Sequence, residues 1–381
     1  MRKLPALTAI AAALAAMPLH AQIPFTSEVV AEFDEPWAVE VMPDGRMLVT
    51  ETKGALFIVG PDGSKSRAVS GVPDVAYGGQ GGLGDVILHP DFADNGVIYL
   101  SYAEAGVPGT DTRGAAVVRA VLDASGSRPS LSNVEVIWRQ YPKFLGYGHY
   151  GHRMMFDRDG YLWITSGERQ KFTPAQDMQS NAGKMIRLND DGSIPGDNPF
   201  VGYDQDDAFV DDGGVYGQVW SYGHRNPYGL VQAENGQIWE IEMGPAGGDE
   251  LNLIERGANY GYPIVSNGEH YDGRPIPDHD TRPQFMAPAT WWTPVISPAD
   301  MLIYRGNAFA DWRGDAFIAG LSSKAIIRVE LHDDGSAEEV ERYDMGARIR
   351  ALAEDAAGQL LVLEDERGGT GGRLLRLSPV N

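Results

Sequence analysis

The sequence predicts an all-β protein, a six-bladed β-propeller of four-stranded antiparallel blades. One pattern occurs six times in the 381 residues: two strand-length apolar runs joined by a polar turn that ends in glycine. The runs are rich in Val, Ile, Leu, Tyr and Trp, residues that favour strands. No convincing amphipathic helix lies between the units. Repeats of this size and character are typical of propeller blades.

Each unit is predicted to form a β-hairpin of one blade, with its glycine in the turn. The segment "SEVVAEF" at 27–33 is expected to lie beside "GRLLRLS" at 372–378 and complete the last blade. That pairing closes the ring and covers both free strand edges. A pair of β-sandwiches is the alternative, which six similar hairpins disfavour. The six turn glycines are Gly45, Gly96, Gly160, Gly236, Gly314 and Gly358.

The first 21 residues have the features of a secretory signal peptide. Arg2 and Lys3 precede an apolar run from Leu4 to Met17, and Ala21 ends a plausible cleavage site. The run is too short to span a membrane, and a retained anchor is the alternative. We therefore expect a signal peptide over 1–21, one propeller catalytic domain over 22–381, and a periplasmic or secreted protein without membrane insertion.

The composition restricts the possible functions. With 43% hydrophobic and 22% charged residues the chain is globular rather than disordered. It has no cysteine, which excludes disulfides, thiolate metal sites and cysteine nucleophiles. The formal net charge of −22 argues against binding to nucleic acid or anionic lipid. It suits a soluble periplasmic protein and the binding of calcium.

Propellers place their sites in the loops that converge on one face of the central channel. In the loop "GHYGHRMMF" at 148–156, His149 is a candidate base. Glu168 ends the hairpin that follows, and because the ends of a hairpin meet, its carboxylate is expected to orient the imidazole. Zinc binding by His149 and His152 is disfavoured, because residues three apart in an extended chain point to opposite faces. A turn histidine bonded to the backbone remains the alternative.

Two further loops carry binding chemistry. The segment "GPAGGDELN" at 244–252 offers main-chain carbonyls, Asp249 and Glu250, which are hard oxygen ligands suited to calcium, or else a solvated acidic turn. Arg225, Arg348 and Arg350 lie in loops of an acidic chain and predict an anionic ligand in the channel. Their alternative role is salt bridging to neighbouring acids such as Asp344 and Glu354.

The loops resemble those of soluble periplasmic quinoprotein sugar dehydrogenases, the aldose sugar dehydrogenase and soluble glucose dehydrogenase family that uses pyrroloquinoline quinone (PQQ). The resemblance runs in order from about Pro36 to Ser378. It rests on "GGQGGLGDVILHPDF", "GHYGHRMMFDRDGYLWITSGER", "SYGHRNPYGL", "GPAGGDELN", "NYGYP" and "RIRA". The family fold is a six-bladed propeller, in agreement with the repeats.

The resemblance implies a role for each matching residue. His149 is similar to the base that takes the proton of the anomeric hydroxyl while hydride passes to the quinone, and Glu168 to its orienting acid. The carbonyls of Gly244 and Pro245 resemble those that hold a calcium ion at PQQ, and Glu250 with the Tyr260 carbonyl those of a second, structural calcium. The residues that resemble cofactor contacts or flat walls of the site are Gln80, Arg225, Asn226, Tyr271, Trp292, Arg348 and Arg350.

The sequence departs from the family pattern at two places. His152 stands where a glycine is more usual, which puts bulk near the base. Ser322 stands where many relatives have a lysine, and Lys324, two residues later, is expected to take its cofactor contact.

The resemblance implies a quinoprotein that oxidises aldose sugars to lactones and passes electrons to a periplasmic cytochrome or quinone. The alternatives are a calcium-dependent six-bladed lactonase and a non-catalytic sugar-binding propeller.

Overall fold

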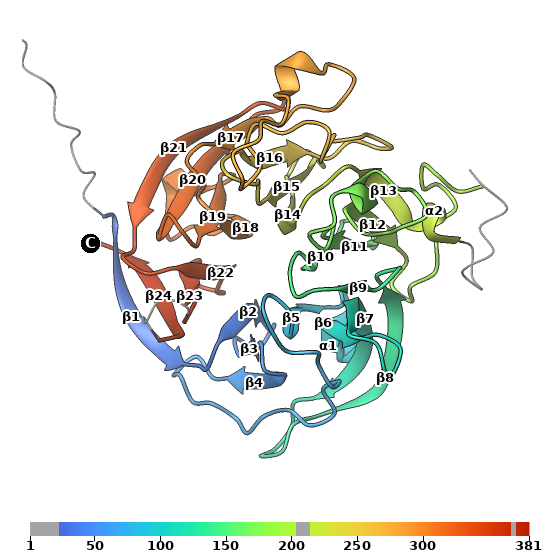
Figure 1. Ribbon diagram of the computed structural model, residues 1–381. Helices are drawn as coiled ribbons and strands as arrows, with labels where there is room; N and C mark the ends of the chain where they lie inside the picture. Colours follow the sequence, from blue (N-terminus) through green and yellow to red (C-terminus); the bar gives the residue numbers. More distant parts are fainter. Residues whose placement is uncertain (1–22, 203–213, 367–370, 381) are drawn as a thin grey trace, which may run out of the picture.

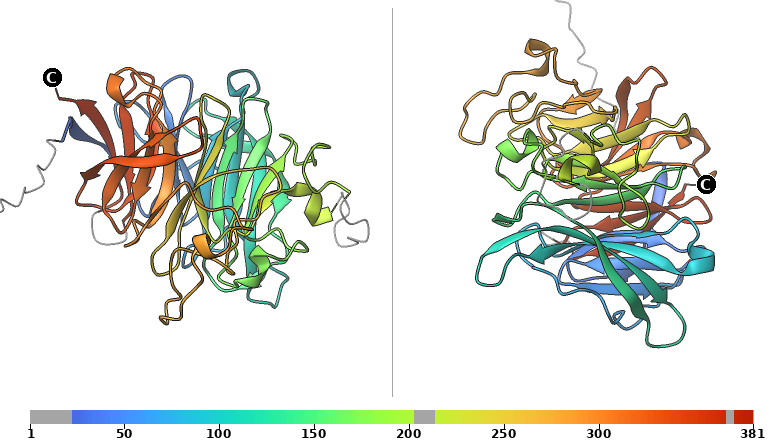
Figure 2. Two further views of the ribbon diagram at one scale, coloured as in Figure 1. Left: turned by 90° about the horizontal axis from the view of Figure 1, so that it is seen from above. Right: turned by 90° about the vertical axis from the view of Figure 1, so that its right-hand side faces the viewer.

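A computed structural model describes residues 23–202, 214–366 and 371–380. Within them the chain forms six antiparallel sheets arranged around a central axis, as the ring of blades in Figure 1 and the side views in Figure 2 show. The predicted six-bladed propeller is confirmed. The predicted signal peptide over 1–21 lies outside the described residues.

All six predicted hairpins form, and each supplies the two innermost strands of one sheet. The six turn glycines have φ between 65° and 95°, a left-handed conformation that glycine adopts without steric cost. The hairpins are β2 (Pro36–Val41) with β3 (Met47–Glu51), β5 (Leu83–Leu88) with β6 (Val97–Ala105), β10 (Gly151–Phe156) with β11 (Leu162–Ser166), β14 (Pro227–Gln232) with β15 (Ile238–Glu242), β18 (Pro298–Ile303) with β19 (Ala316–Gly320), and β22 (Ile349–Glu354) with β23 (Leu360–Glu364).

The outer strands show where the blades depart from the predicted four. The sheet of β2 has three strands; beside β4, Ser66 N still donates to Ile58 O at 2.9 Å, an irregular remnant of a fourth. In the next sheet a short extra strand, β9, pairs with β7. The outer strands are β4 (Ala55–Val59), β7 (Thr112–Asp123), β8 (Ser130–Arg139), β9 (Phe144–Leu145), β12 (Lys184–Leu188), β13 (Val219–Tyr222), β16 (Asp249–Leu253), β17 (Thr290–Trp292), β20 (Ala325–Leu331), β21 (Ala337–Asp344), β24 (Arg373–Pro379) and β1 (Phe25–Glu32).

The ring is closed by the two ends of the chain. β1 pairs antiparallel with β24, with Ser27 opposite Leu377 and Glu28 opposite Arg376. The blue and dark red strands lie side by side in Figure 1. The predicted pairing of 27–33 with 372–378 is therefore confirmed.

Helices are a minor part of the structure. The described residues contain no helix that has both the length and the apolar character needed to cross a membrane. The helices are α1 (Phe92–Asn95) and α2 (Gly214–Gln218), with the 3₁₀ turns η1 (Thr173–Ala175), η2 (His279–Thr281) and η3 (Ala310–Trp312).

Apolar layers fill the space between neighbouring sheets. Tyr99 of β6 and Ile164 of β11 lie in one such layer, and Trp239 of β15 and Ile318 of β19 lie in another. Both faces of most strands are buried, so each sheet is covered on both sides by its neighbours.

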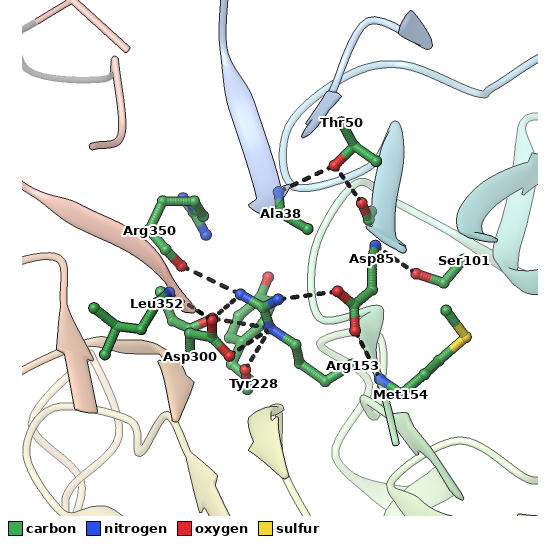
Figure 3. Close-up of polar contacts among 12 residues, drawn as sticks. Ala38, Thr50, Asp85, Ser101, Arg153, Met154, Tyr228, Asp300, Arg350 and Leu352 are labelled. Atoms are coloured by element: carbon green, nitrogen blue, oxygen red, sulfur yellow. Dashed lines mark hydrogen bonds and ion pairs between the residues drawn. The ribbon is translucent and has the colours of Figure 1, made fainter. Parts of the chain in front are cut away.

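One arginine fastens the sheets to one another at the axis (Figure 3). Arg153, on β10, is 5% exposed, and its guanidinium carbon lies 4.2 Å from the ring centre of Trp37 on β2. Its remaining partners lie on the first strands of the other four sheets, so that the side chain of Arg153 contacts all five sheets besides its own. The remaining partners are Asp85 (3.1 Å), Asp300 (3.3 Å) and the carbonyls of Tyr228 (3.0 Å), Ala299 (2.8 Å) and Arg350 (3.2 Å).

Candidate active site

The predicted site residues come from two kinds of loop at one end of the sheets. One kind leads into a first strand and carries His149, Arg225 and Arg348; the other joins a second strand to a third and carries Glu168 and Gly244. Because consecutive strands are antiparallel, both kinds of loop emerge on the same face of the ring.

His149 and Glu168 form a buried pair, as predicted. His149 Nδ1 lies 2.5 Å from Glu168 Oε1, and the exposed fractions of the two residues are 4% and 0%. The second oxygen of Glu168 accepts hydrogen bonds from the backbone N–H groups of Lys171 and Phe172. Those two donors stabilise an ionised carboxylate, so Nδ1 carries the proton toward Oε1 and Nε2 keeps a free lone pair.

The backbone at His149 is held in place by two hydrogen bonds. His149 has φ of 52°, an uncommon conformation for a residue with a side chain. Its N–H donates to Gln80 Oε1 at 2.6 Å, and its carbonyl accepts from Arg169 N at 3.1 Å. These bonds from the preceding sheet and from the end of its own hairpin fix the direction of the imidazole.

The environment keeps His149 neutral at physiological pH. Burial lowers the pKa of His149 below its usual 6.5, although the hydrogen bond to Glu168 acts in the opposite direction. Burial alone would raise the pKa of Glu168, but the bonds from His149 and the Phe172 N–H hold it below its usual range. A neutral imidazole beside an ionised carboxylate can accept a proton at Nε2.

The pair lies in a pocket of about 260 Å³. Arg225 is buried against its wall, and its Nη2 donates to the Tyr271 hydroxyl at 3.2 Å. Tyr271 is 77% exposed and stands at the rim. The pocket is lined by His149, Glu168, Gln170, Phe172, Arg225, Pro245, Tyr262, His270, Tyr271, Asp272 and Arg274.

Asn226 offers unused polar groups beside this pair. Its side chain is fully buried, and neither its amide nitrogen nor its oxygen has a hydrogen-bond partner. A buried amide in this condition costs about 1–3 kcal/mol unless a further group bonds to it. The side chain therefore fits a ligand contact, as does Arg225.

Arg348 and Arg350 lie together, as predicted, but both bind an acid that the sequence did not indicate. Arg348 Nε and Arg350 Nη2 donate to Asp365 Oδ2 at 2.9 and 3.0 Å. The predicted alternative partners, Asp344 and Glu354, accept backbone N–H groups elsewhere. Asp365 follows β23, so the second-to-third-strand loop of the last sheet supplies the missing carboxylate.

Among the predicted calcium ligands next to the pocket, Gly244 and Asp249 already accept hydrogen bonds. The Gly244 carbonyl accepts a hydrogen bond from Arg225 Nη1 at 2.6 Å, and Pro245 lines the pocket. Asp249 accepts three backbone N–H groups, those of Gly244, Ile296 and Ser297. Asp249 therefore fixes the turn, and its oxygens are not free for a metal.

Glu250 and Tyr260, predicted to hold a second calcium, lie farther back. Glu250 is buried, with Oε1 3.4 Å from His279 Nε2, and the Tyr260 ring stacks on the His224 ring. Near them lie three residues that were not predicted from the sequence, His224, Glu240 and Glu242, whose ligand atoms lie within 4.8 Å of one another. The two acids alternate in "IWEIE" on a strand with apolar neighbours, and that pattern could have revealed them.

Trp292 and His152 occupy other positions than the predicted roles require, whereas Lys324 lies on a loop of the same face as the pocket. Trp292 is 7% exposed in the apolar layer between β15 and β18, where its Nε1 donates to Glu339, so it does not line the pocket. Lys324 is exposed on the β19–β20 turn. His152 packs between Trp37 and Tyr150 in the interior, and therefore adds no bulk to the pocket.

Comparisons with known proteins agree with this geometry. A family model described as Glucose / Sorbosone dehydrogenase matches residues 33–376. The chain belongs to this family. It is 37% identical over 357 residues to the aldose sugar dehydrogenase YliI of Escherichia coli, covering 92% of this chain and 91% of the relative. It is 29% identical to quinoprotein glucose dehydrogenase B of Acinetobacter calcoaceticus, over 89% of this chain and 85% of the relative.

Solved structures of the family share the fold. The apo form of the Escherichia coli aldose sugar dehydrogenase superposes with a TM-score of 0.83 at 36% identity, covering 93% of this chain and all of that one. The PQQ-bound form of an aldose sugar dehydrogenase from Streptomyces coelicolor gives a TM-score of 0.73 at 26% identity, over 93% and 98% of the two chains.

Proposed function

We propose that the protein oxidises aldose sugars at the anomeric carbon to lactones, with PQQ as cofactor and His149 as base. The observation that carries the proposal is the buried His149–Glu168 pair, whose free Nε2 belongs to a pocket that Arg225 also lines. Membership of a family of sugar dehydrogenases supports the substrate class.

His149 supplies the proton transfer that this oxidation needs. Nε2 accepts the proton of the anomeric hydroxyl as hydride leaves the same carbon, so the C–O bond becomes a carbonyl. Glu168 stabilises the imidazolium that forms, because its ionised carboxylate faces Nδ1. PQQ, when bound, accepts the hydride, which is the redox chemistry that the protein itself cannot supply.

The wall of the pocket fits a polyanionic cofactor. PQQ carries three carboxylates, and Arg225 offers a buried guanidinium whose Nη2 donates to the rim hydroxyl of Tyr271. The unpartnered amide of Asn226 offers a donor and an acceptor in the same place. Gln80, Tyr271, Lys324, Arg348 and Arg350 are proposed as further contacts, all on loops of the same face.

Calcium is proposed at two places. The carbonyls of Gly244 and Pro245 would hold one ion beside the cofactor, and Glu250 with the Tyr260 carbonyl a second. Oxygen donors of this kind suit calcium. An ion at Gly244 requires that carbonyl to lose its hydrogen bond from Arg225, since a guanidinium and a cation compete for one oxygen.

We further propose export to the periplasm by the segment 1–21 and a periplasmic cytochrome or quinone as electron acceptor. The non-catalytic and lactonase alternatives do not explain a neutral imidazole oriented by a buried carboxylate.

The proposal is tested by stripping metals from the purified protein and restoring PQQ and calcium separately and together. Oxidation of glucose and other aldoses is followed with an artificial dye acceptor, beside His149→Ala and the exposed control Glu135→Gln. We expect activity that needs PQQ and that His149→Ala abolishes while the control retains it. Absence of PQQ binding would refute the cofactor assignment, and full activity of His149→Ala would refute the base.

A further inference from the structure

Behind the pocket lies a cluster of three ionisable groups that the proposed reaction does not use. His224 is in the loop between β13 and β14, and Glu240 and Glu242 are on β15. His224 Nδ1 is 3.5 Å from Glu242 Oε1 and 4.0 Å from Glu240 Oε2. The three exposed fractions are 0%, 0% and 3%.

The alternation of β15 puts both acids on one face. Trp239 and Ile241 point into the apolar layer shared with β18 and β19, so Glu240 and Glu242 point the other way, toward the sheet of β10–β13. The register of β15 with β16 sets Asn252 opposite Glu240 and Glu250 opposite Glu242. Carboxylates thus stand where the other interfaces between sheets hold apolar side chains.

Polar atoms of this cluster point at one another without partners. His224 Nδ1, Glu240 Oε1 and Asn252 Oδ1 are buried and form no hydrogen bond. The other ring nitrogen of His224 is 2.8 Å from Ser221 Oγ. Each unpartnered buried group costs about 1–3 kcal/mol. Asn252 Nδ2 donates to Glu240 Oε2 at 3.2 Å and to Glu242 Oε1 at 3.3 Å. The unpartnered His224 Nδ1 and Glu240 Oε1 still indicate a missing partner that accepts electron pairs from both nitrogen and oxygen.

The negative charge of the buried carboxylates also indicates a missing cation. Burial raises the pKa of Glu240 well above its usual range, and the negative charges of Glu242 and Glu250 raise it further. Buried carboxylates are normally paired with a cation or coordinated to a metal. Without such a group Glu240 has to hold a proton.

We propose that His224, Glu240 and Glu242 bind one divalent transition-metal ion of the Mn²⁺ or Zn²⁺ class, with Asn252 Oδ1 as a further donor. An imidazole nitrogen among carboxylates suits such ions, whereas calcium takes oxygen ligands. Bonds of about 2.0–2.2 Å at tetrahedral angles separate ligand atoms by about 3.3–3.6 Å. The separations of 3.5 and 4.0 Å need a movement of a few tenths of an ångström at most to meet this.

The ion would act on the pocket through Glu242. The second carboxylate oxygen of Glu242 accepts the backbone N–H groups of Arg225 at 2.5 Å and Asn226 at 3.1 Å. A metal on Oε1 fixes the carboxylate that orients the backbone of both residues. Glu242 is in this sense a positioning residue, and Glu250, proposed as a calcium ligand, lies opposite it on the neighbouring strand.

The test is a titration of metal-stripped protein with Mn²⁺, followed by electron paramagnetic resonance in a large excess of calcium. Calcium fills sites made of oxygen alone, so only a mixed nitrogen and oxygen site should still bind Mn²⁺. We expect one tight site per chain, weakened at least about 100-fold in Glu240→Gln. Glu250→Gln and the exposed Glu135→Gln should retain it. The readout is independent of PQQ and of turnover.

Several results would decide the matter. Because Glu240→Gln keeps the shape of the side chain, a folded variant is expected, and circular dichroism confirms it; His224→Gln serves as a second variant. No Mn²⁺ or Zn²⁺ bound by the unmodified chain would overturn the proposal and leave a protonated Glu240. Binding lost in Glu250→Gln but kept in Glu240→Gln would place the ion at the other site.

Discussion

Arg153 contacts the first strand of each of the other five sheets, and its replacement by methionine tests how much these contacts stabilise the fold. Methionine keeps an unbranched apolar stem but is shorter than arginine and lacks the guanidinium. Asp85 and Asp300 then stay buried without their cation, and the carbonyls of Tyr228, Ala299 and Arg350 lose a donor. No residue that lines the pocket is changed.

The expected loss of stability follows from the buried partners that the substitution leaves without a cation. Breaking a buried ion pair by removing one partner costs about 3–5 kcal/mol, because the other charge is left uncompensated. With an unfolding entropy of about 0.7 kcal/mol/K for a chain of this size, the melting temperature should fall by about 4–7 °C. The measurement is thermal and urea unfolding of the unmodified chain, Arg153→Met, and the exposed control Arg158→Met, which should stay within about 0.5 kcal/mol.

The deficit should also depend on pH. Burial raises the pKa of Asp300 to about 6 and that of Asp85 above its usual range, while Arg153 opposes both shifts. Removing Arg153 raises both values further, so the destabilisation is largest where the carboxylates are charged and shrinks as pH falls and they bind protons. A loss below about 1 kcal/mol at pH 7.5, or a loss that grows between pH 7.5 and pH 5, would refute the account.

Three predictions concern the pocket. Glu168→Gln should lower kcat by about 10²–10⁴ with little change in KM in the dye assay, since His149 loses its orienting charge; a change in KM alone would contradict this. In the unmodified enzyme kcat/KM should fall with decreasing pH only below the usual histidine pKa of 6.5, because burial lowers that of His149 and the base must be neutral; a fall beginning above pH 7 would be inconsistent. Tyr271→Ala should raise KM for the sugar while leaving the melting temperature unchanged, because the side chain is 77% exposed; an unaltered KM for every aldose would exclude a substrate contact.

The sequence by itself determined the features that depend on neighbouring residues. Strand-length runs with a turn glycine fixed all six inner hairpins, because that glycine alone accepts the left-handed turn without cost. The same local geometry placed Glu168 beside His149, since both ends of one hairpin must meet. The closing strand was also predictable, because an open ring would leave two free edges that only the chain ends could cover.

The tertiary structure decided which of several similar side chains is buried and which partner each one contacts. Of the adjacent Trp291 and Trp292, strand alternation buries one in a layer between sheets and exposes the other, and the sequence carries no mark of the difference. Asp365, rather than the acids nearest in sequence, meets Arg348 and Arg350. These outcomes depend on strand register and on contacts between distant segments. The contacts of Arg153 with five other sheets form only once the ring has closed, and so do those of His224 with two acids of β15. No local sequence pattern encodes contacts between separate blades.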